Sequence, residues 1–296
     1  MNQDKRCGYA AIVGRPNVGK STLMNAILGQ KLSITSHKRQ TTRHIIHGIK
    51  TQDNIQVVYV DTPGIHRDKK NALNRHMNKS ALSSVNDVNV IVFVVDVNVW
   101  TEEDEIVFNA VKEQKVPVIL AANKIDEIKN KDDLLPKLQD LSAKLPFAVL
   151  VPISAKRRKN IGELEQLILN DMPEGEHMFE EEQITDRNDN FLISEAIREK
   201  LFFNVHQEIP YSTTIIVDEM KKKKDVLHIY ATIYVEKKAQ KIIIIGKNGE
   251  LIKQIGKQAR LALEKMYATK VYLQLWVKVK EGWTDNAKLL GGLGFE

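Results

Sequence analysis

The chain is poor in cysteine and in long hydrophobic runs. Cys7 is the single cysteine among 296 residues, which excludes a disulfide within the chain and is typical of a reducing compartment. The longest apolar stretch, VNVIVFVVDV from Val88, contains Asp96 and falls far short of the roughly 20 apolar residues of a transmembrane helix. The first residues, MNQDKRCGYAAIVG, lack the apolar core of a secretion signal. We therefore expect a cytoplasmic protein.

The chain does have length and an uneven distribution of charge. Its 296 residues exceed the roughly 100–200 residues of a usual domain, so we expect two domains. Residues 221–280 contain 15 lysines and arginines against 4 acids, whereas residues 174–219 contain 3 against 12. The basic segment is therefore a candidate anion-binding surface, with an ordinary solvated lysine surface as the alternative.

The first part of the chain alternates between strand and helix patterns. Short, nearly continuous apolar runs, typical of parallel strands buried on both faces, occupy 9–14, 55–60, 90–95, 117–122 and 148–153. Helical patterns lie between them, one opened by a capping signal at Thr101 and Asp104 and another closed by Gly29. This order predicts a doubly wound α/β domain with a mostly parallel sheet over residues 1–173.

The second part follows a different order. Residues 174–190 are acidic and are predicted to form a linker. A helical pattern over 191–205 precedes strand patterns at 212–220, 226–236 and 271–279, and the first two strands are joined through a KKKKD turn. We therefore predict a separate, smaller α+β domain over residues 191–296.

The segment GRPNVGKS, Gly14 to Ser21, matches a phosphate loop and lies between a strand and a helix, as that motif requires. Its glycines let backbone N–H groups surround phosphate oxygens, and the helix N-terminus adds positive charge. Lys20 is predicted to reach the β- and γ-phosphates, and the Ser21 hydroxyl to bind Mg²⁺. The loop residues assigned to the nucleotide are Gly14, Arg15, Pro16, Asn17, Val18, Gly19, Lys20, Ser21 and Thr22.

Two further segments complete the phosphate and metal site. DTPG follows a strand, where Asp61 is placed to hold the magnesium shell and the Gly64 amide to contact the γ-phosphate, with Thr62 and Pro63 between them. The polar segment SITSHKRQTTRH is predicted to contain a switch threonine that completes the magnesium shell. Thr42 is our choice and Thr41 is its rival. Lys20, Thr42 and Gly64 are the predicted catalytic residues.

The choice of base is predicted from NKID, residues 123–126, and from SAK, residues 154–156. The Asp126 carboxylate can accept hydrogen bonds from guanine N1–H and N2–H₂, and adenine offers no matching pair of donors. The Ala155 amide is predicted to lie near guanine O6. The residues assigned to the base site are Asn123, Lys124, Asp126, Ser154, Ala155 and Lys156. We therefore expect GTP or GDP as the ligand.

A second glycine loop, GKNGELIKQIG, lacks the hydroxyl residue that would follow a phosphate-loop lysine, so it is not a second triphosphate site. Its G-x-x-G matches the KH fold, whose loop clamps about four nucleotides, with a plain helical corner as the alternative. Isoleucines 242–245 and Ile252 are predicted to form an apolar floor for bases. The residues assigned to RNA are Gly246, Lys247, Asn248, Gly249, Ile252, Lys253 and Lys257.

The motifs GRPNVGKSTLMNAI, ITSHKRQTTRH, DTPGIH, NKID and SAK, together with the C-terminal domain, resemble the Era-like GTPases of the translation-factor-related class along nearly the whole chain. The resemblance implies a type II KH domain and a short helix at 242–245. It implies a slow GTP/GDP switch in small ribosomal subunit maturation that binds single-stranded RNA near the 3′ end of the small-subunit ribosomal RNA. We expect a monomer.

One position bears on hydrolysis. Where many GTPases carry a water-orienting glutamine, this chain has Ile65, which cannot orient water by hydrogen bonding. Some related GTPases with asparagine at the Asn17 position use K⁺ in place of an arginine finger, so K⁺ is a candidate ion beside Mg²⁺. Catalysis is then expected to be electrostatic, through Lys20, Mg²⁺ and backbone donors.

Two other function classes are open to this composition. A membrane-surface signalling GTPase would rest its lysine-rich domain on anionic lipid at the cytoplasmic face of the cell membrane. An ATP-driven RNA enzyme is disfavoured by NKID. The G-x-x-G loop favours RNA over lipid, because a lipid surface requires charge but no nucleotide clamp.

Overall fold

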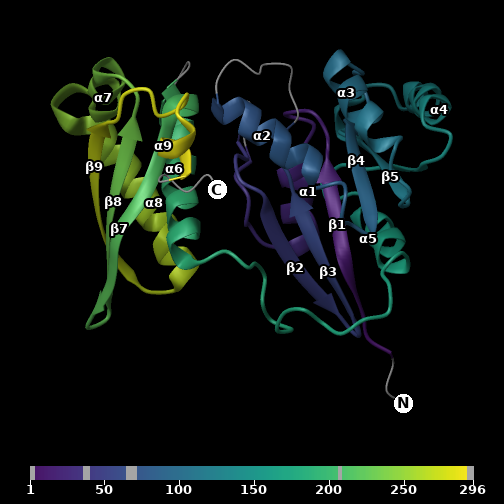
Figure 1. Cartoon of the computed structure of the whole chain (residues 1–296), viewed down its shortest axis with the longest axis horizontal. Coiled ribbons are helices and arrows are strands. Elements are labelled where there is room, and N and C mark those ends of the chain that lie inside the picture. The colour runs from purple at the N-terminus through teal and green to yellow at the C-terminus, as the bar shows by residue number, and fades with distance from the viewer. Residues whose placement is uncertain (1–3, 36–40, 65–71, 206–208, 292–296) are drawn as a thin grey trace. The chain divides into compact units, whose positions relative to one another are not determined.

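The computed structural model describes residues 4–35, 41–64, 72–205 and 209–291. The chain divides into two compact units, residues 1–70 with 74–186 and residues 71–73 with 187–296. Each unit contains its own sheet and its own helices (Figure 1). None of the helices in the described part of the chain is long and apolar enough to cross a membrane.

The sheet of the first unit has six strands in the order β2-β3-β1-β4-β5-β6. All neighbouring pairs are parallel except β2 with β3. The strands are β1 (Arg6–Val13), β2 (Ile46–Gln52), β3 (Ile55–Asp61), β4 (Val90–Asp96), β5 (Val118–Asn123) and β6 (Val149–Pro152). The five predicted runs all form strands, and β4 is buried along its whole length, as expected for a parallel strand between two layers of helices.

The antiparallel strand β2 is absent from the sequence prediction. Its sequence, IHGIKTQ, has no continuous apolar run and contains a glycine, which usually weakens a strand. A Cβ atom at Gly48 would lie 2.7 Å from side-chain carbons of Met24 and of Leu28. Glycine therefore lets the first helix pack closely on this strand, which is a tertiary reason that strand propensity cannot reveal.

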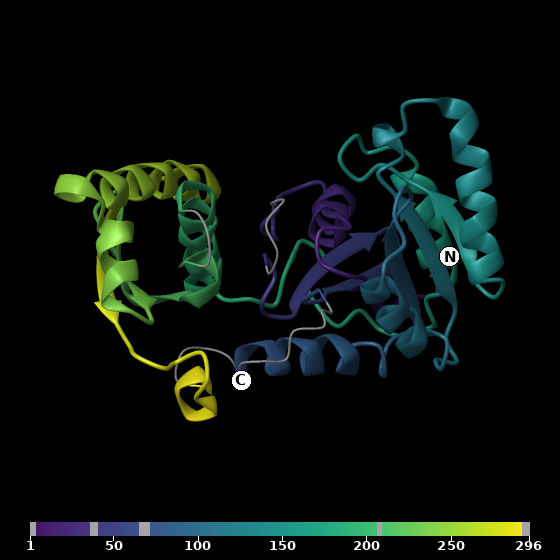
Figure 2. The ribbon, with the colours of Figure 1, turned by 90° about the horizontal axis from the view of Figure 1, so that it is seen from above.

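Helices cover both faces of this sheet. The helices are α1 (Lys20–Leu28), α2 (Ala72–Ser83), α3 (Glu102–Val111), α4 (Leu134–Lys144) and α5 (Ile161–Asn170), with short 3₁₀ turns η1 (Ile125–Glu127) and η2 (Lys131–Asp133). Apolar residues of α2, α3 and α4 share one core with β1, β4 and β5. The purple helix α1 and the blue helix α2 lie on opposite sides of the sheet (Figure 2). The predicted doubly wound arrangement is present, and α1 and α3 are the helices predicted from Gly29 and from the Thr101 cap.

The acidic segment that was predicted as a linker is hydrogen-bonded to the first unit up to residue 184. The Gly175 amide donates to the Lys5 carbonyl at 2.9 Å, and the Ile49 amide donates to the Ile184 carbonyl at 2.9 Å. Between these points, the amides of Met178 and Phe179 both donate to Gln56 Oε1. This stretch therefore follows the strands β1, β3 and β2 in turn.

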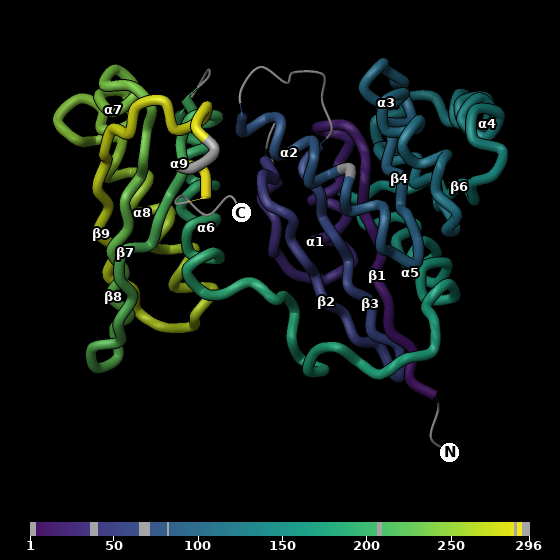
Figure 3. Tube along the Cα trace, in the orientation of Figure 1, coloured from purple at the N-terminus to yellow at the C-terminus, as the bar shows by residue number. Residues whose placement is uncertain are grey.

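The second unit is an α+β domain with a three-stranded sheet in the order β7-β8-β9. Its elements are α6 (Asp189–Asn204), η3 (Ile209–Ser212), β7 (Thr213–Lys223), β8 (Val226–Val235), α7 (Lys238–Ile245), η4 (Lys247–Gly249), α8 (Glu250–Tyr267), β9 (Lys270–Val279) and α9 (Ala287–Gly291). The strand β8 pairs antiparallel with β7 and parallel with β9, so β9 forms one edge of this sheet (Figure 3). Residues 242–245 are helical, as the family resemblance implied.

The core of this unit lies on one face of its sheet. The buried side chains of Ile229, Ala231 and Ile233 point from β8 toward α6, α7 and α8, which supply Ile197, Ile244 and other apolar residues to the same core. Side chains alternate along a strand, so residues of the opposite parity face away from the helices.

Candidate nucleotide and nucleic-acid sites

The predicted phosphate loop connects the end of β1 to the start of α1, and its backbone requires glycine at both ends. Gly14 and Gly19 have φ values of 153° and 105°. A Cβ atom at Gly14 would lie 2.4 Å from the Val94 carbonyl oxygen, and one at Gly19 would lie 2.3 Å from Asn123 Nδ2. The loop therefore packs directly against the ends of the neighbouring strands β4 and β5.

The Lys20 side chain is held inside this loop. Its Nζ atom donates to the carbonyl oxygens of Gly14 and Arg15, both at 3.0 Å, and the residue is only 6% exposed. Burial lowers the pKa of Lys20 to about 8, while the nearby Asp61 carboxylate acts in the opposite direction. A cation that is poorly solvated and surrounded by backbone dipoles is suited to bind a phosphate group.

Three predicted metal ligands lie together at the start of α1. The hydroxyl groups of Ser21 and Thr42 are 2.8 Å apart, and Thr42 Oγ1 donates to Asp61 Oδ2 at 3.3 Å. Asp61 is fully buried, burial raises its pKa, and Oδ1 has no hydrogen-bond partner among the described residues. An oxygen-only ligand set that includes a carboxylate fits Mg²⁺. Thr42 is 5% exposed and joins this cluster, which favours it over Thr41.

The DTPG segment closes against the phosphate loop. Thr62 Oγ1 donates to the Ile12 carbonyl oxygen at 3.0 Å, which fixes the chain where β3 ends. A Cβ atom at Gly64 would lie 2.8 Å from both the backbone nitrogen and Cγ of Pro16. Gly64 therefore allows two segments that are far apart in sequence to touch. Ile65 lies outside the described residues.

The predicted base-recognition residues lie beside the same loop. Asn123 Nδ2 donates to the Val18 carbonyl oxygen at 2.7 Å, and Asn123 Oδ1 accepts the Ala155 amide at 3.0 Å. The Ser154 hydroxyl donates to Asp126 Oδ1 at 2.5 Å, which orients that carboxylate. NKID and SAK are thus joined to each other and to the phosphate loop. The Ala155 amide, predicted to face guanine O6, donates to Asn123 in this structure.

The remaining predicted nucleotide residues differ in exposure. Pro16 and Val18 are buried, Thr22 and Lys124 are half-buried, and Asn17 and Lys156 are exposed. Lys124 Nζ is paired with Asp96 Oδ2 at 2.7 Å. Asp96 ends β4 and was not assigned to the site, although its place at the carboxyl end of a central strand was the available signal.

Sequence reasoning also missed the partner of Arg15. Arg15 Nε donates to Asp104 Oδ2 at 2.8 Å, and Asp104 has no exposed surface. The same carboxylate caps α3, where it accepts hydrogen bonds from the backbone and hydroxyl of Thr101. The predicted cap is therefore confirmed, and it has the additional role of holding the phosphate loop. Eighty-nine residues separate Arg15 from Asp104, so no local pattern indicates the pair.

The G-x-x-G loop of the second unit has the backbone that its glycines predict. Gly246, Asn248 and Gly249 all have positive φ values, of 73°, 52° and 77°. A Cβ atom at Gly246 would lie 2.7 Å from Leu251 Cβ, so the loop packs tightly on the start of α8. Lys247 and Asn248 at its tip are exposed.

A groove of about 480 Å³ follows this loop between α8 and β9. It is lined by the predicted residues Ile252, Lys253 and Lys257, and by residues that were not predicted: Gly256, Arg260, Leu273, Gln274 and Leu275. The predicted floor of isoleucines 242–245 needs correction. Ile244 is fully buried in the core, because a helical turn directs only some of these side chains outward. Ile252 and the leucines of β9 supply the apolar lining instead.

Two family models match the chain. Residues 9–124 match the model of the 50S ribosome-binding GTPase, and residues 208–284 match the model of the KH domain. Among curated relatives, GTPase Era of Azotobacter vinelandii is 52% identical over 290 residues, covering 98% of this chain and 97% of the relative. GTPase Era of Pseudomonas aeruginosa is 53% identical over 290 residues, covering 98% and 95%.

Two solved structures match with similar coverage. One is Aquifex aeolicus Era, as a variant bound to GDP·AlF₄⁻, with a TM-score of 0.94 and 39% identity over 98% of this chain and 99% of that one. The other is Era in complex with MgGDPNP and nucleotides 1506–1542 of 16S ribosomal RNA, with a TM-score of 0.95 and 40% identity over the same shares. These matches confirm the predicted fold class, a P-loop GTPase domain followed by a KH domain.

Proposed function

The chain belongs to the Era family of GTPases, and we propose that its nucleotide state controls binding of single-stranded RNA at the 3′ end of the small-subunit ribosomal RNA. It binds guanine nucleotides and hydrolyses GTP. The proposed setting is the assembly of the small ribosomal subunit. The related Era in complex with a 16S ribosomal RNA segment supports this proposal.

The observation that carries the RNA assignment is the groove beside the G-x-x-G loop. Ile252 and Leu275 offer apolar surface to bases, while Lys253 and Lys257 lie on the helical side of the groove, where phosphates would pass. A Cβ atom at Gly249 would meet nothing within 4 Å, so this glycine leaves open space at the loop for an approaching RNA backbone. A groove that combines apolar lining, lysines and a glycine clamp is suited to single-stranded RNA.

Hydrolysis would depend on charges that are in place before the nucleotide binds. Lys20 and the N–H groups of the phosphate loop would stabilise the charge that develops on the transferred phosphoryl group. Ser21, Thr42 and Asp61 would hold Mg²⁺, which supplies a positive charge to the phosphate oxygens when bound. K⁺ near Asn17 remains a candidate second ion.

Equilibrium binding of the labelled 3′-terminal segment of small-subunit ribosomal RNA tests the proposed function. Anisotropy is measured with the protein loaded with a non-hydrolysable GTP analogue or with GDP. We expect a higher RNA affinity in the GTP-like state and no comparable affinity for duplex RNA of equal length. Anionic vesicles at matched ionic strength test the membrane alternative in parallel. Equal RNA affinity in both nucleotide states would contradict the proposed switch.

A further inference from the structure

The face of the second sheet that points away from its helices carries a cluster of aromatic side chains. His228 and Tyr230 lie on β8, and Tyr272 and Trp276 lie on β9, all on the parity opposite to the core residues. We call these four residues the aromatic face. Tyr272 and Trp276 remain 46% and 40% exposed. Single exposed aromatic residues are common on protein surfaces, but a contiguous group of them is a candidate contact surface for a ligand or a partner.

The rings of the aromatic face form a continuous row. The Tyr230 and Trp276 rings stack with centroids 6.0 Å apart and planes at 20°. Tyr272 lies 6.1 Å from Tyr230 and 5.1 Å from His228. Part of this contact is ordinary cross-strand packing, which stabilises the sheet. The exposed sides of the rings are nevertheless flat apolar surfaces of the size that a nucleobase covers when it stacks.

The charge around the aromatic face is positive. The three strands contain five lysines against Asp218 and Glu219. Lys221 Nζ lies 5.4 Å from the Tyr230 ring centroid, and it is also paired with Glu219 at 2.7 Å. Lys270 and Lys278 share the parity of Tyr272 and Trp276, so they lie on the same face. Aromatic rings among lysines are the combination found in surfaces that bind single-stranded nucleic acid.

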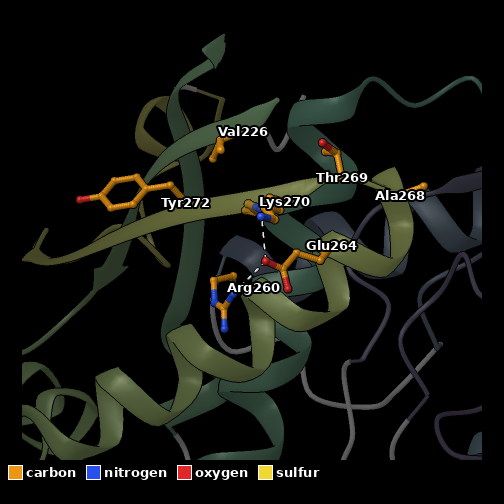
Figure 4. A pocket seen from close by; sticks show the side chains of 8 residues that line it. Val226, Arg260, Glu264, Ala268, Thr269, Lys270 and Tyr272 are labelled. Carbon is orange, nitrogen blue, oxygen red and sulfur yellow. Dashed lines mark hydrogen bonds and ion pairs between the residues drawn. The ribbon is translucent and has the colours of Figure 1, made fainter. Parts of the chain in front are cut away.

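The aromatic face is connected to the G-x-x-G groove. Arg260 lines the groove and also lines a second pocket of about 740 Å³, which contains Lys270 and Tyr272 (Figure 4). In that view Tyr272 projects from β9 away from Arg260 and Glu264. Glu264 is the acid of this pocket, and it is paired with Arg260 at 2.8 Å. At the strand itself, the Tyr272 hydroxyl donates to Gln274 Oε1 of the groove at 3.3 Å.

We propose that a single-stranded RNA held by the G-x-x-G loop continues past Arg260 and over the edge strand β9, and stacks its next bases on Tyr272 and Trp276. This inference rests on the proposed RNA-binding function and extends its site. RNA is favoured over a protein partner because the flat rings lie among lysines and follow directly from the groove. The RNA site is therefore longer than the about four nucleotides of a KH clamp.

The test compares two single-stranded RNAs copied from the 3′ end of the small-subunit ribosomal RNA, one of about four nucleotides and one about three times as long. Binding to the full chain is measured for the unchanged protein and for the double variant Tyr272→Ala, Trp276→Ala. Tyr272→Phe with Trp276→Phe keeps both aromatic faces. Phe203→Ala is the matched control, because Phe203 is 50% exposed on α6 of the same unit.

We expect the affinity of the double alanine variant for the long RNA to fall at least about fivefold for each base that no longer stacks. Its affinity for the short RNA should be the same as that of the unchanged protein. The double phenylalanine variant and Phe203→Ala should bind both RNAs like the unchanged protein. The fluorescence of Trp276 should be quenched by the long RNA, and this quenching should be absent in Trp276→Phe.

Three results would overturn the inference. One is unchanged affinity of the double alanine variant for the long RNA. Another is an equal loss for both RNAs with a lowered unfolding midpoint, which would make the rings structural. The third is that the double alanine variant no longer binds phosphatidylserine vesicles but binds the long RNA with full affinity. If the unchanged protein binds neither RNA, the proposed RNA-binding function itself fails.

Discussion

At the scale of single residues, Asp126 is the strongest test of base selection. Asp126→Asn should lose most of its GDP affinity and gain preference for xanthine nucleotide, because an amide cannot accept both guanine donors but can donate to a xanthine carbonyl. Ser154 already orients this side chain through a 2.5 Å hydrogen bond, so the change should not disturb the fold. Competition between GDP and XDP measures the preference. Glu127→Gln, an exposed acid-to-amide change next to it, is the control, and unaltered selectivity in Asp126→Asn would refute the assignment.

Lys20 gives a pH dependence with a definite sign. Its pKa is lowered by burial to about 8, so above that pH an increasing fraction of the nucleotide-free protein has a neutral lysine. A bound phosphate favours the charged form, and GDP binding must then take up a proton. Affinity should therefore fall as pH rises from about 8 toward the ordinary lysine value of 10.5.

Titration calorimetry at about pH 8.5 in two buffers of different ionisation enthalpy measures this proton uptake. The Lys20→Arg variant keeps its positive charge and should show no proton uptake on binding GDP. Equal binding heats in the two buffers for the unchanged protein would argue against a lowered pKa of Lys20. The same shift affects stability in the opposite direction to affinity. Between the lowered and the ordinary pKa the unfolded chain binds more protons, so the free energy of unfolding contributed by Lys20 rises with pH across that window.

At the scale of elements, the first turn of α3 stabilises the phosphate loop as well as the helix. Asp104→Ala would remove the cap of α3 and leave the partly buried Arg15 guanidinium without its ion-pair partner. We expect the free energy of unfolding to fall by about 3 kcal/mol, and GDP affinity to fall as well, because the Arg15 carbonyl also holds Lys20. Denaturant unfolding and nucleotide binding measure both effects. Glu113→Ala, at an exposed acid just after α3, should change neither.

The G-x-x-G loop is the corresponding element of the second unit. Lys247→Asp with Asn248→Asp places negative charge where an RNA backbone would pass, and should abolish RNA binding while GDP binding is retained. Both side chains are exposed, and aspartate tolerates the positive φ of Asn248, so the fold should survive. The matched control is Lys115→Asp with Asn86→Asp, which makes the same change in net charge at exposed positions of the first unit. This control should leave RNA binding unchanged. RNA affinity that survives the loop change would remove the clamp from this loop.

At the scale of the whole molecule, each unit has its own hydrophobic core, so the two should unfold as separate cooperative transitions. GDP at about 100 times its dissociation constant should stabilise the first unit by about 2.7 kcal/mol. The unfolding temperature of the second unit should stay the same. Scanning calorimetry with and without GDP checks this. A single transition that shifts as a whole would show that the cores are thermodynamically coupled.

Most of the fold could be predicted because its signals are local. The five parallel strands are short apolar runs, the cap of α3 lies within four residues, and each glycine loop requires its own backbone conformation. The strand β2 could not be predicted, because its glycine is explained by contact with α1 and not by any strand preference. The course of residues 174–184 along the first unit was also beyond prediction, since hydrogen bonds to Lys5, Gln56 and Ile49 depend on where those strands lie.

The sequence by itself determined which chemistry the chain carries: a phosphate loop, a guanine-recognition motif and a G-x-x-G clamp, in that order. These motifs are short, and their function depends on residue types and backbone freedom within a few positions. Only the tertiary structure brought Thr42 to Ser21 and Asp61, joined Arg15 to Asp104, and made a groove from α8 and β9. Those arrangements depend on which strands are neighbours in the sheets, and neighbours in a sheet are chosen by burial across the whole unit.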